Sequence, residues 1–325
     1  MKIVIPGGTG QVGGILRRAL SQQGHEVVVL SRRPTALEPG IRHVRWDGRT
    51  VGDWAAEIDG ADAVINLAGR TVNCRYTDEH RAEMMDSRVD STQAVGQAIE
   101  RAERPPRVWL QTSTATIYEH TYGPAHGEDG RIGGGEEAAP ASWAFSVEIA
   151  QRWEAAQQQA DTPRTRRVAL RSALVMSPDR GGVFDILLRM ARLGVGGPVA
   201  GGRQYVSWIH EHDFVRAVEL LLTRDDIEGP VNLASPFPVP QRELMKVLRN
   251  GRIGLPATRL MAEMGAFVLR SETELLLKSR RVVPARLLEE GFVFDHPTWP
   301  DAAADLVRRH RTRTGMHAAV VGVDP

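Results

Sequence analysis

The chain has 325 residues, a formal net charge of +1 and a hydrophobic content of 42%. This length usually forms about two domains of roughly 150 residues each, and the near-neutral charge argues against nucleic acid as a partner. No segment approaches the roughly 18 apolar residues of a membrane span, and one cysteine excludes an internal disulfide, so we expect a cytoplasmic protein without a membrane partner.

The first thirteen residues predict a strand, a phosphate-binding turn and the start of a helix. The apolar run Ile3-Val4-Ile5 ends in glycines, and helical spacing of apolar residues follows. In such a turn Gly7 permits the tight bend, Gly10 lets the backbone approach a pyrophosphate, and Gly13 lets the helix pack on the strand. The helix N-terminus then faces an anion. The residues expected to bind a dinucleotide here are Gly7, Gly8, Thr9, Gly10, Gln11, Val12 and Gly13.

A second strand is predicted at 26–30, and Ser31, Arg32 and Arg33 follow it. An NAD-specific site would carry an acidic residue here for the ribose 2′-hydroxyl, whereas a small hydroxyl and two arginines suit a 2′-phosphate. We therefore expect NADP, with NADPH preferred over NADH, although solvated arginines would give the same pattern. Asp47 follows a third strand and either meets the adenine edge or serves its own loop.

The order of strands and helices then repeats. A continuous apolar strand ends in Leu67, Ala68 and Gly69, whose small tip lets a cofactor lie close to the backbone. A helix from Thr77 to about Arg101 and a strand from Val108 follow. This βαβαβ order predicts an α/β fold with a doubly wound parallel sheet, the Rossmann arrangement. Three further residues are expected to contribute to the cofactor site, namely Arg88, Thr112 and Arg171.

A hydroxyl cluster, residues 112–118, stands at the carboxyl end of the strand that begins at Val108, where open α/β sheets place their ligands. Thr114 is the candidate for hydrogen bonding a substrate oxygen, although such hydroxyls also satisfy turns. Tyr118, four residues later, is the candidate acid or base, with packing at the strand end as the alternative. Tentative substrate contacts are Asn73, Arg75, Phe145 and Tyr205.

Residues 119–142 lack periodicity, and a loop of this length is usually a lid or a disordered segment. Its possible ligands His120, His126, Glu128 and Asp129 do not have the spacing of a metal site. A later His210-x-His212 pair is typical of capping and packing. We therefore expect no metal.

The remaining chain predicts a division into two domains. Residues 1–175 form the nucleotide-binding domain, and 211–235 return to it through a strand at 231–234. Residues 176–210 and 236–311 form a smaller, mainly helical substrate domain. The last residues, 312–325, have no pattern and are expected to be a flexible tail.

Three motifs resemble the extended branch of the short-chain dehydrogenase/reductase superfamily, which contains nucleotide-sugar epimerases and dehydratases. They are Gly7-Gly8-Thr9-Gly10-x-x-Gly13, Asn66-Leu67-Ala68-Gly69 and Ser113-Thr114-Ala115-Thr116-Ile117-Tyr118. The chain is also similar to an atypical epimerase-like subgroup, described as cell-division-inhibitor-like or SulA-like, which has its own C-terminal domain. The motifs shared with it include Asp86-Ser87-Arg88-Val89-x-Ser91-Thr92, Trp153-Glu154, Gly196-Gly197-Pro198 and Arg281-Val282-Val283-Pro284-x-Arg286-Leu287-Leu288-Glu289-x-Gly291-Phe292.

The superfamily's catalytic tyrosine and the lysine four residues later are absent. Phe145 and Ile149 stand in their places, and no lysine occurs between Lys2 and Lys246. The resemblance therefore implies an NADP(H)-dependent oxidoreductase or epimerase-like protein, a monomer or homodimer, that acts on a small carbonyl or hydroxyl compound without the usual pair. The alternative is a catalytically degenerate NADP(H)-binding sensor or partner-binding protein.

Overall fold

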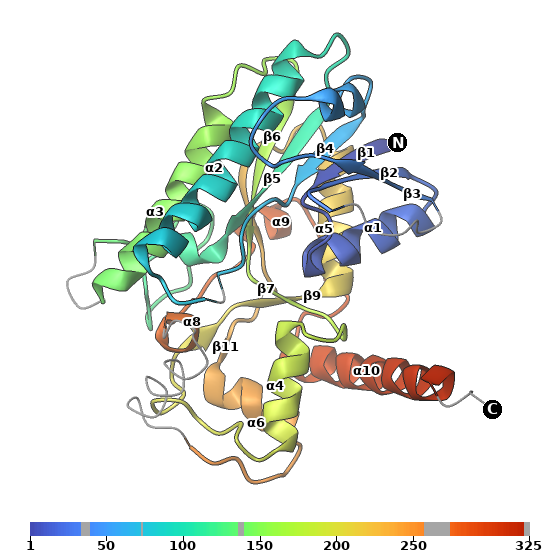
Figure 1. Ribbon diagram of the computed structural model, residues 1–325. Coiled ribbons are helices and arrows are strands. Elements are labelled where there is room, and N and C mark those ends of the chain that lie inside the picture. The colour runs from blue at the N-terminus through green and yellow to red at the C-terminus, as the bar shows by residue number, and fades with distance from the viewer. Residues whose placement is uncertain (34–39, 73, 136–139, 257–273, 322–325) are drawn as a thin grey trace.

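The computed structural model describes residues 1–33, 40–72, 74–135, 140–256 and 274–321 (Figure 1). Its centre is a seven-stranded parallel sheet in the order β10-β6-β5-β4-β1-β2-β3. The strands are β1 (Lys2–Pro6), β2 (Glu26–Ser31), β3 (Ile41–Arg45), β4 (Ala63–Asn66), β5 (Val108–Thr114), β6 (Arg166–Ser172) and β10 (Gly229–Leu233). The predicted Rossmann fold is confirmed, and the strand predicted at 231–234 does return to the sheet beside β6.

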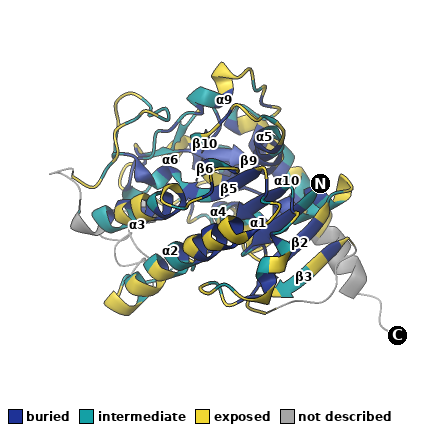
Figure 2. Cartoon of the chain, turned by 90° about the horizontal axis from the view of Figure 1, so that it is seen from above, coloured by how far each residue is buried: buried dark blue, intermediate teal, exposed yellow. Residues whose placement is uncertain are grey.

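Helices cover both faces of the sheet, because successive side chains of a strand point to opposite sides. Ile3 and Ile5 of β1 pack in one core with Leu16, while Val4 packs in the other with Val95. Figure 2 shows the strands buried between helices whose outer faces are exposed. The covering helices are α1 (Gln11–Gln22) and α5 (Glu211–Thr223) on one face and α2 (Asp78–Arg101) and α3 (Ala141–Gln158) on the other.

The order of the strands fixes where a ligand binds. The chain runs from β1 to β2 and β3 on one side of β1, and then crosses back from β3 to β4 on the other side. The helices that follow β1 and β4 therefore diverge and leave a crevice at the carboxyl ends of these two strands, which is where doubly wound sheets bind nucleotides. Short 3₁₀ turns, η1 (Asp53–Glu57) and η2 (Ala115–Ile117), complete this part of the chain.

A second unit lies beyond the carboxyl ends of the sheet strands (Figure 1). It has its own core around Phe184, Trp208 and Trp299. Its strands pair as β7 with β9 and as β8 with β11. The elements are β7 (Leu174–Met176), α4 (Val183–Arg192), β8 (Tyr205–Val206), β9 (Trp208–His210), β11 (Val239–Pro240), α6 (Gln241–Arg249), α8 (Glu274–Leu277) and α10 (Trp299–Val321). Helix α9 (Ala285–Glu289) instead packs on β10, because Leu287 lies in the core of the sheet.

The loop expected as a lid or disordered segment, 119–142, is held in place over its residues 119–135. The amide of Glu119 donates to the carbonyl of Arg131 at 2.9 Å. His126 exchanges backbone hydrogen bonds with Arg281 and Val283, at 2.8 and 2.9 Å. These partners come from the far end of the chain, so no local sequence pattern reveals them. Residues 136–139 lie outside the described residues.

The tail predicted at 312–325 is helical over most of its length, because α10 continues to Val321. A helix that has already formed its first turns adds residues at little cost, so the extension needs no apolar period of its own. Residues 322–325 lie outside the described part of the chain. None of the described helices is both long and apolar enough to cross a bilayer.

His210 joins the sheet domain to the second unit. Its Nδ1 accepts a hydrogen bond from the backbone N–H of His212 at 3.1 Å and so caps α5, and its Nε2 lies 3.2 Å from Asp305 of α10. Because Nδ1 accepts, the neutral ring carries its proton on Nε2. Burial, together with the nearby His296 and Arg309, lowers the pKa of His210 well below its usual range.

This lowered pKa predicts acid-sensitive stability. The unfolded chain protonates His210 near pH 6.5, whereas the folded protein does not, so stability decreases as the pH falls below about 6.5. His210→Asn keeps a capping acceptor but cannot titrate, and we expect its free energy of unfolding in urea to change less between pH 7 and pH 5 than that of the wild type. His212→Asn, exposed on the same helix, is the control. Equal pH dependence in wild type and His210→Asn would contradict the role of His210.

Candidate functional site

The turn after β1 has the close backbone contacts that its glycines predict. Gly7 has a φ of +74°, and a Cβ there would lie 2.6 Å from the Cα of Ala68. A Cβ on Gly13 would lie 2.4 Å from the carbonyl oxygen of Gly8. At Gly10 no atom lies within 4 Å of the Cβ position, so a ligand can approach the backbone. No side chain caps the N-terminus of α1, whose amides are therefore available to an anion.

One cavity of about 750 Å³ lies beside this turn at the ends of β1, β2 and β4. The hydroxyl oxygen of Ser31 is buried in its wall and makes no hydrogen bond with a described residue. Arg32 also lines the cavity, whereas Arg33 is not among its lining residues, although both side chains are exposed. The predicted cofactor residues that line it are Gly7, Thr9, Gly10, Ser31, Arg32, Asp47, Leu67, Ala68 and Gly69.

Asp47 lies at this cavity, yet its carboxylate serves its own loop. Oδ1 accepts hydrogen bonds from the amides of Arg49 and Thr50, at 2.8 and 2.9 Å, and Oδ2 accepts one from the Thr50 hydroxyl. The loop role considered for Asp47 from the sequence is therefore the one that the described contacts support.

A second cavity of about 370 Å³ extends from the same turn to the end of β5 and to the second unit. Both cavities are lined by Gly7, Gly10, Leu67 and Gly69, so together they form one elongated cleft around the glycine turn. The predicted residues of the second cavity are Gly7, Gly10, Gln11, Val12, Gly13, Leu67, Gly69, Arg88, Thr112 and Thr114. Gly8 lines neither cavity, and it instead receives the close approach of Gly13.

Two buried polar groups in this cavity suit an anionic or hydroxyl-bearing ligand. The guanidinium of Arg88 donates to the carbonyls of Met84 and Arg70, and no described carboxylate pairs with it. Its face packs over the ring of Trp153, and burial lowers the pKa of Arg88 to about 10. The hydroxyl of Thr112 is buried and has no hydrogen-bond partner in the part of the chain that the structure describes. A phosphate or ribose in the cleft would satisfy both groups, which is the fit expected for a dinucleotide.

Thr114 faces the same cavity. Its Oγ1 accepts a hydrogen bond from the amide of Thr116 at 3.1 Å, so its own hydroxyl proton remains available for a ligand oxygen. Helix α3 brings Ser146 to the cavity, and the Ser146 hydroxyl donates to Glu274 Oε2 at 2.5 Å. Glu274 belongs to α8 and is almost fully buried.

Charged residues of the second unit surround Glu274. Lys278 Nζ lies 3.5 Å from Glu274 and donates to the carbonyl of Thr116 at 2.9 Å. The Arg280 guanidinium donates through Nε to Thr116 Oγ1 at 3.0 Å, and burial lowers the pKa of Arg280. Buried charges are stable only when they are paired or hydrogen bonded, so this cluster is a fixed part of the cavity wall.

The positions of the missing catalytic pair show what replaced it. Ile149 lines the cavity, whereas Phe145 packs behind it, edge-on against Tyr76 with ring centroids 5.7 Å apart. The guanidinium of Arg81 lies 5.0 Å above the ring of Phe145. Phe145, a tentative substrate contact, is therefore not among the lining residues, but it holds Tyr76, which is.

Tyr118, predicted as the acid or base, points away from the cavity. Its hydroxyl donates to Asn232 at 2.8 Å and accepts from Arg171 at 2.9 Å, and burial raises the pKa of its phenol. Arg171, predicted to bind cofactor, forms a bidentate ion pair with Glu154 at 2.9 and 2.8 Å. Neither residue lines the cleft. The cleft therefore gives neither prediction support, because the turn η2 directs the Tyr118 ring into the core, where its hydroxyl accepts a hydrogen bond from Arg171.

Two more of the tentative substrate contacts, Arg75 and Tyr205, are not among the residues that line the cleft. Asn73 lies outside the described residues. Arg75 is half-buried. Tyr205, in β8, lies beneath the guanidinium of Arg281, which is 4.3 Å from its ring centroid.

Four polar residues that the sequence did not single out line the cavity, namely Tyr76, Ser146, Glu274 and Arg280. Ser146 stands next to the position of the missing tyrosine, which was the one available signal. Glu274 and Arg280 come from a segment with no motif for catalysis, and only the folded chain brings them to β5.

Among the described residues, one group could supply three metal ligands: His210, His296 and Asp305, whose ligand atoms lie within 4.8 Å of one another. His210 would have to bind metal through Nε2 while Nδ1 accepts from His212, which requires a doubly deprotonated ring. The group is therefore better suited to joining β9 to α10 than to holding a metal.

The parallel sheet and the glycine turn define a dinucleotide-binding α/β protein. Residues 3–234 match the NAD dependent epimerase/dehydratase family, and the chain belongs to this family. Residues 260–306 match a domain of unknown function, DUF1731. This second description names no cell-division role.

Relatives match over nearly the whole chain. The human epimerase family protein SDR39U1 is 29% identical over 315 residues, covering 94% of this chain and 100% of the human protein. Its crystal structure with NADPH has a TM-score of 0.81 at 28% identity, covering 95% of this chain and 99% of that chain. A Staphylococcus epidermidis epimerase family protein is 30% identical over 308 residues, covering 94% of this chain and 99% of that protein. The structure of a nucleoside-diphosphate sugar epimerase from Corynebacterium glutamicum has a TM-score of 0.72 at 26% identity, covering 94% of this chain and 57% of that chain.

The buried ion pair of Arg171 predicts a large loss of stability when its partner is neutralised. Glu154→Gln leaves a buried guanidinium without a counter-charge, and we expect the free energy of unfolding in urea to fall by about 3 kcal/mol. The control is Glu148→Gln, whose exposed pair with Arg152 on the same helix is worth at most about 1 kcal/mol. Equal losses in the two variants would show that the Arg171 pair does not stabilise the core.

Proposed function

We propose that this protein is an NADPH-dependent oxidoreductase, or an epimerase that oxidises and reduces its substrate in turn, acting on a small carbonyl or hydroxyl compound. The observation that carries the proposal is that one cavity joins the glycine turn to Thr114 and to the Ser146–Glu274 pair. A cofactor held by the turn would thus meet hydroxyl and carboxyl groups at its reactive end. The NADPH-bound structure of human SDR39U1 supports the same choice of cofactor.

The preference for NADP over NAD is proposed from the wall at the end of β2. Ser31 offers a buried hydroxyl without a described partner, and Arg32 adds a cation to the same cavity. No acidic residue follows β2 in the position that would bind a ribose 2′-hydroxyl. A 2′-phosphate would be held by both groups.

When bound, the nicotinamide supplies hydride to a carbonyl carbon or accepts it from a carbinol carbon. The Thr114 hydroxyl orients the substrate oxygen by donating a hydrogen bond to it. During reduction the Ser146 hydroxyl gives its proton to that oxygen and takes one from Glu274, which is in turn reprotonated by the Lys278 ammonium. Oxidation moves the proton in reverse. This route replaces the absent tyrosine and lysine pair with groups from α3 and α8.

A second candidate function is a cofactor-binding sensor without catalysis. The observation that favours it is that Ile149 lines the cavity where the family lysine would stand, and that Phe145 packs behind it. Such a protein would bind NADPH tightly, turn over no substrate and present the bound state to a protein partner.

We also propose four further properties that were predicted from the sequence. They are the placement in the cell-division-inhibitor-like subgroup, a cytoplasmic location, a monomeric or homodimeric state, and the division into a nucleotide-binding domain and a substrate domain. The separate core of the second unit supports that division.

Arg32→Glu tests the choice of cofactor. Repulsion between the new carboxylate and the 2′-phosphate should weaken NADPH binding by about tenfold, or ~1.4 kcal/mol, and leave NADH binding within about twofold of the wild type. Isothermal titration with each cofactor measures both constants. Arg33→Glu is the matched control, because Arg33 follows directly but does not line the cavity. Equal weakening of both cofactors by Arg32→Glu would refute the proposed phosphate contact.

Ser146→Ala and Glu274→Gln test the proton route. General acid–base groups contribute about 10²-fold or more, so a carbonyl-reduction assay should show kcat lowered by about 100-fold in each variant with the Kd for NADPH unchanged. Glu148→Gln, exposed on the same helix as Ser146, should retain wild-type turnover. Tyr118→Phe should also retain it, because its hydroxyl lies outside the cleft. NADPH binding without turnover across a carbonyl-substrate screen would favour the sensor.

A further inference from the structure

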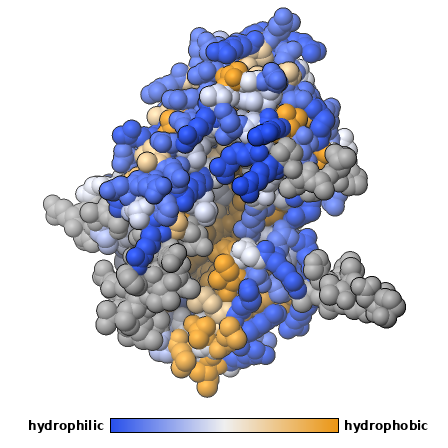
Figure 3. All heavy atoms as spheres, in the orientation of Figure 1, coloured by the Kyte–Doolittle hydropathy of each residue, from blue (hydrophilic) through white to orange (hydrophobic). Residues whose placement is uncertain are grey.

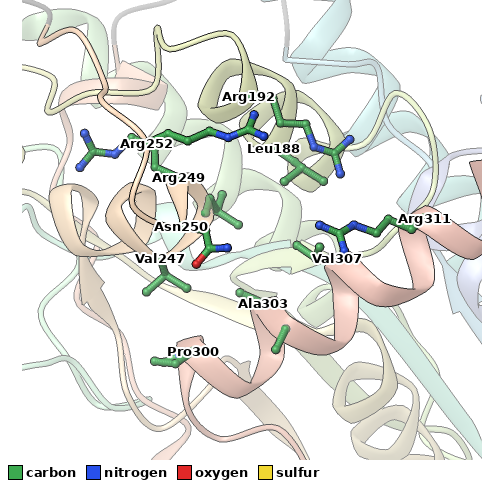
Figure 4. A pocket seen from close by; sticks show the side chains of 12 residues that line it. Leu188, Arg192, Val247, Arg249, Asn250, Arg252, Pro300, Ala303, Val307 and Arg311 are labelled. Atoms are coloured by element: carbon green, nitrogen blue, oxygen red, sulfur yellow. The ribbon is translucent and has the colours of Figure 1, made fainter.

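A third cavity lies in the second unit, between α4, α6 and α10, and none of its lining residues lines the dinucleotide cleft (Figure 4). Its volume is about 410 Å³, within the range of small-molecule sites. We name it the arginine groove. Its apolar wall consists of Leu188, Val247, Leu248, Pro300, Ala303, Ala304 and Val307, and its polar wall of Arg192, Arg249, Asn250, Arg252 and Arg311.

The four arginines of the groove form no ion pair with any described carboxylate. Figure 4 shows Arg192 and Arg311 extending toward one another at one end of the groove, with Pro300 and Ala303 along another side. The Nε of Arg249 is buried and has no hydrogen-bond partner among the described residues. The positive charges of Arg192 and Arg311 repel one another, and a bound anion would offset this repulsion.

Neighbouring arginines on the same helices do have acidic partners. Arg308 and Arg309 of α10 pair with Asp305, and Arg189 of α4 lies 3.7 Å from Asp185. The absence of partners is therefore a property of the groove and not of these helices. A favourable contact with the helix dipole explains cations in the last turns of α4 and α6, but it does not explain Arg311, which lies in the middle of α10.

Apolar surface continues beyond the groove. The loops that follow α4 and α6 are joined by a hydrogen bond from the amide of Leu255 to the carbonyl of Gly194, at 2.8 Å. They expose four large apolar side chains, and Figure 3 shows apolar residues gathered at this end of the molecule. These side chains are Leu193, Val195, Ile253 and Leu255.

We propose that the arginine groove binds an organic phosphate with an apolar body. Guanidinium groups match phosphate oxygens with paired hydrogen bonds, and several arginines that line one groove suit a group that carries more than one negative charge. The apolar wall and the adjoining exposed side chains receive the body of the ligand. This site is separate from the dinucleotide cleft, so it does not depend on the proposed oxidoreductase activity.

Isothermal titration of the full chain with octyl phosphate tests the proposal. We expect octyl phosphate to bind at least about tenfold more tightly than inorganic pyrophosphate, which lacks the apolar body, and binding to weaken as salt is added. Arg192→Gln together with Arg311→Gln should reduce affinity for octyl phosphate by about tenfold or more. Both side chains are exposed, and unchanged NADPH binding would show that the double variant is folded. Arg203→Gln, outside the groove, is the control.

Co-sedimentation with vesicles distinguishes a soluble ligand from a lipid. Sedimentation with vesicles of phosphatidylcholine and phosphatidate, but not with phosphatidylcholine alone, would identify a lipid headgroup as the phosphate, provided that the double variant stays in solution. Binding of octyl phosphate without vesicle binding would identify a soluble ligand. Failure of octyl phosphate to bind, or equal binding by the wild type and the double variant, would overturn the proposal.

Discussion

The site depends on one set of contacts just beyond the end of β5. Lys278 and Arg280 donate hydrogen bonds to Thr116, and Glu274 lies beside both of them and accepts from Ser146. Three charged side chains from the second unit are buried there, and each is held by a hydrogen bond or by an opposite charge. Because unpaired charges are costly to bury, this arrangement fixes where the second unit meets the sheet. It closes the far wall of the cavity that begins at the glycine turn, and thus brings carboxyl and hydroxyl groups to the place where the family's tyrosine is missing.

The hydrogen-bond partners of a buried arginine indicate whether it stabilises the fold or faces a ligand. Arg171 donates hydrogen bonds to both oxygens of Glu154, to Tyr118 and to the carbonyl of Glu128, and it lines no part of the cleft. Arg88 has only carbonyl partners and lines the cavity, so a ligand phosphate would complete its environment. The arginines of the groove in the second unit lack described acidic partners as well. The dinucleotide cleft and the arginine groove thus share one feature: each is lined by arginine without a described carboxylate partner.

Local and periodic features could be predicted from the sequence. The apolar runs and the glycine spacing predict the Rossmann order correctly, because parallel strands and their turns are encoded within a few residues. Thr114 could be placed in the site for the same reason, since it ends a strand. Tyr118 could not be placed, because its ring direction depends on the turn η2 and on Asn232, far along the chain. Glu274 could not be found at all, since nothing near it in the sequence indicates that α8 meets β5.

A crystal structure of this protein with NADPH tests the central claim most directly. The account predicts that the nicotinamide ring lies in the cavity between Thr114 and Ser146, with the 2′-phosphate beside Ser31 and Arg32 and a phosphate or ribose oxygen near Arg88 and Thr112. A nicotinamide ring directed out of this cavity, or a cofactor excluded from it by Glu274 and Arg280, would contradict the proposed site.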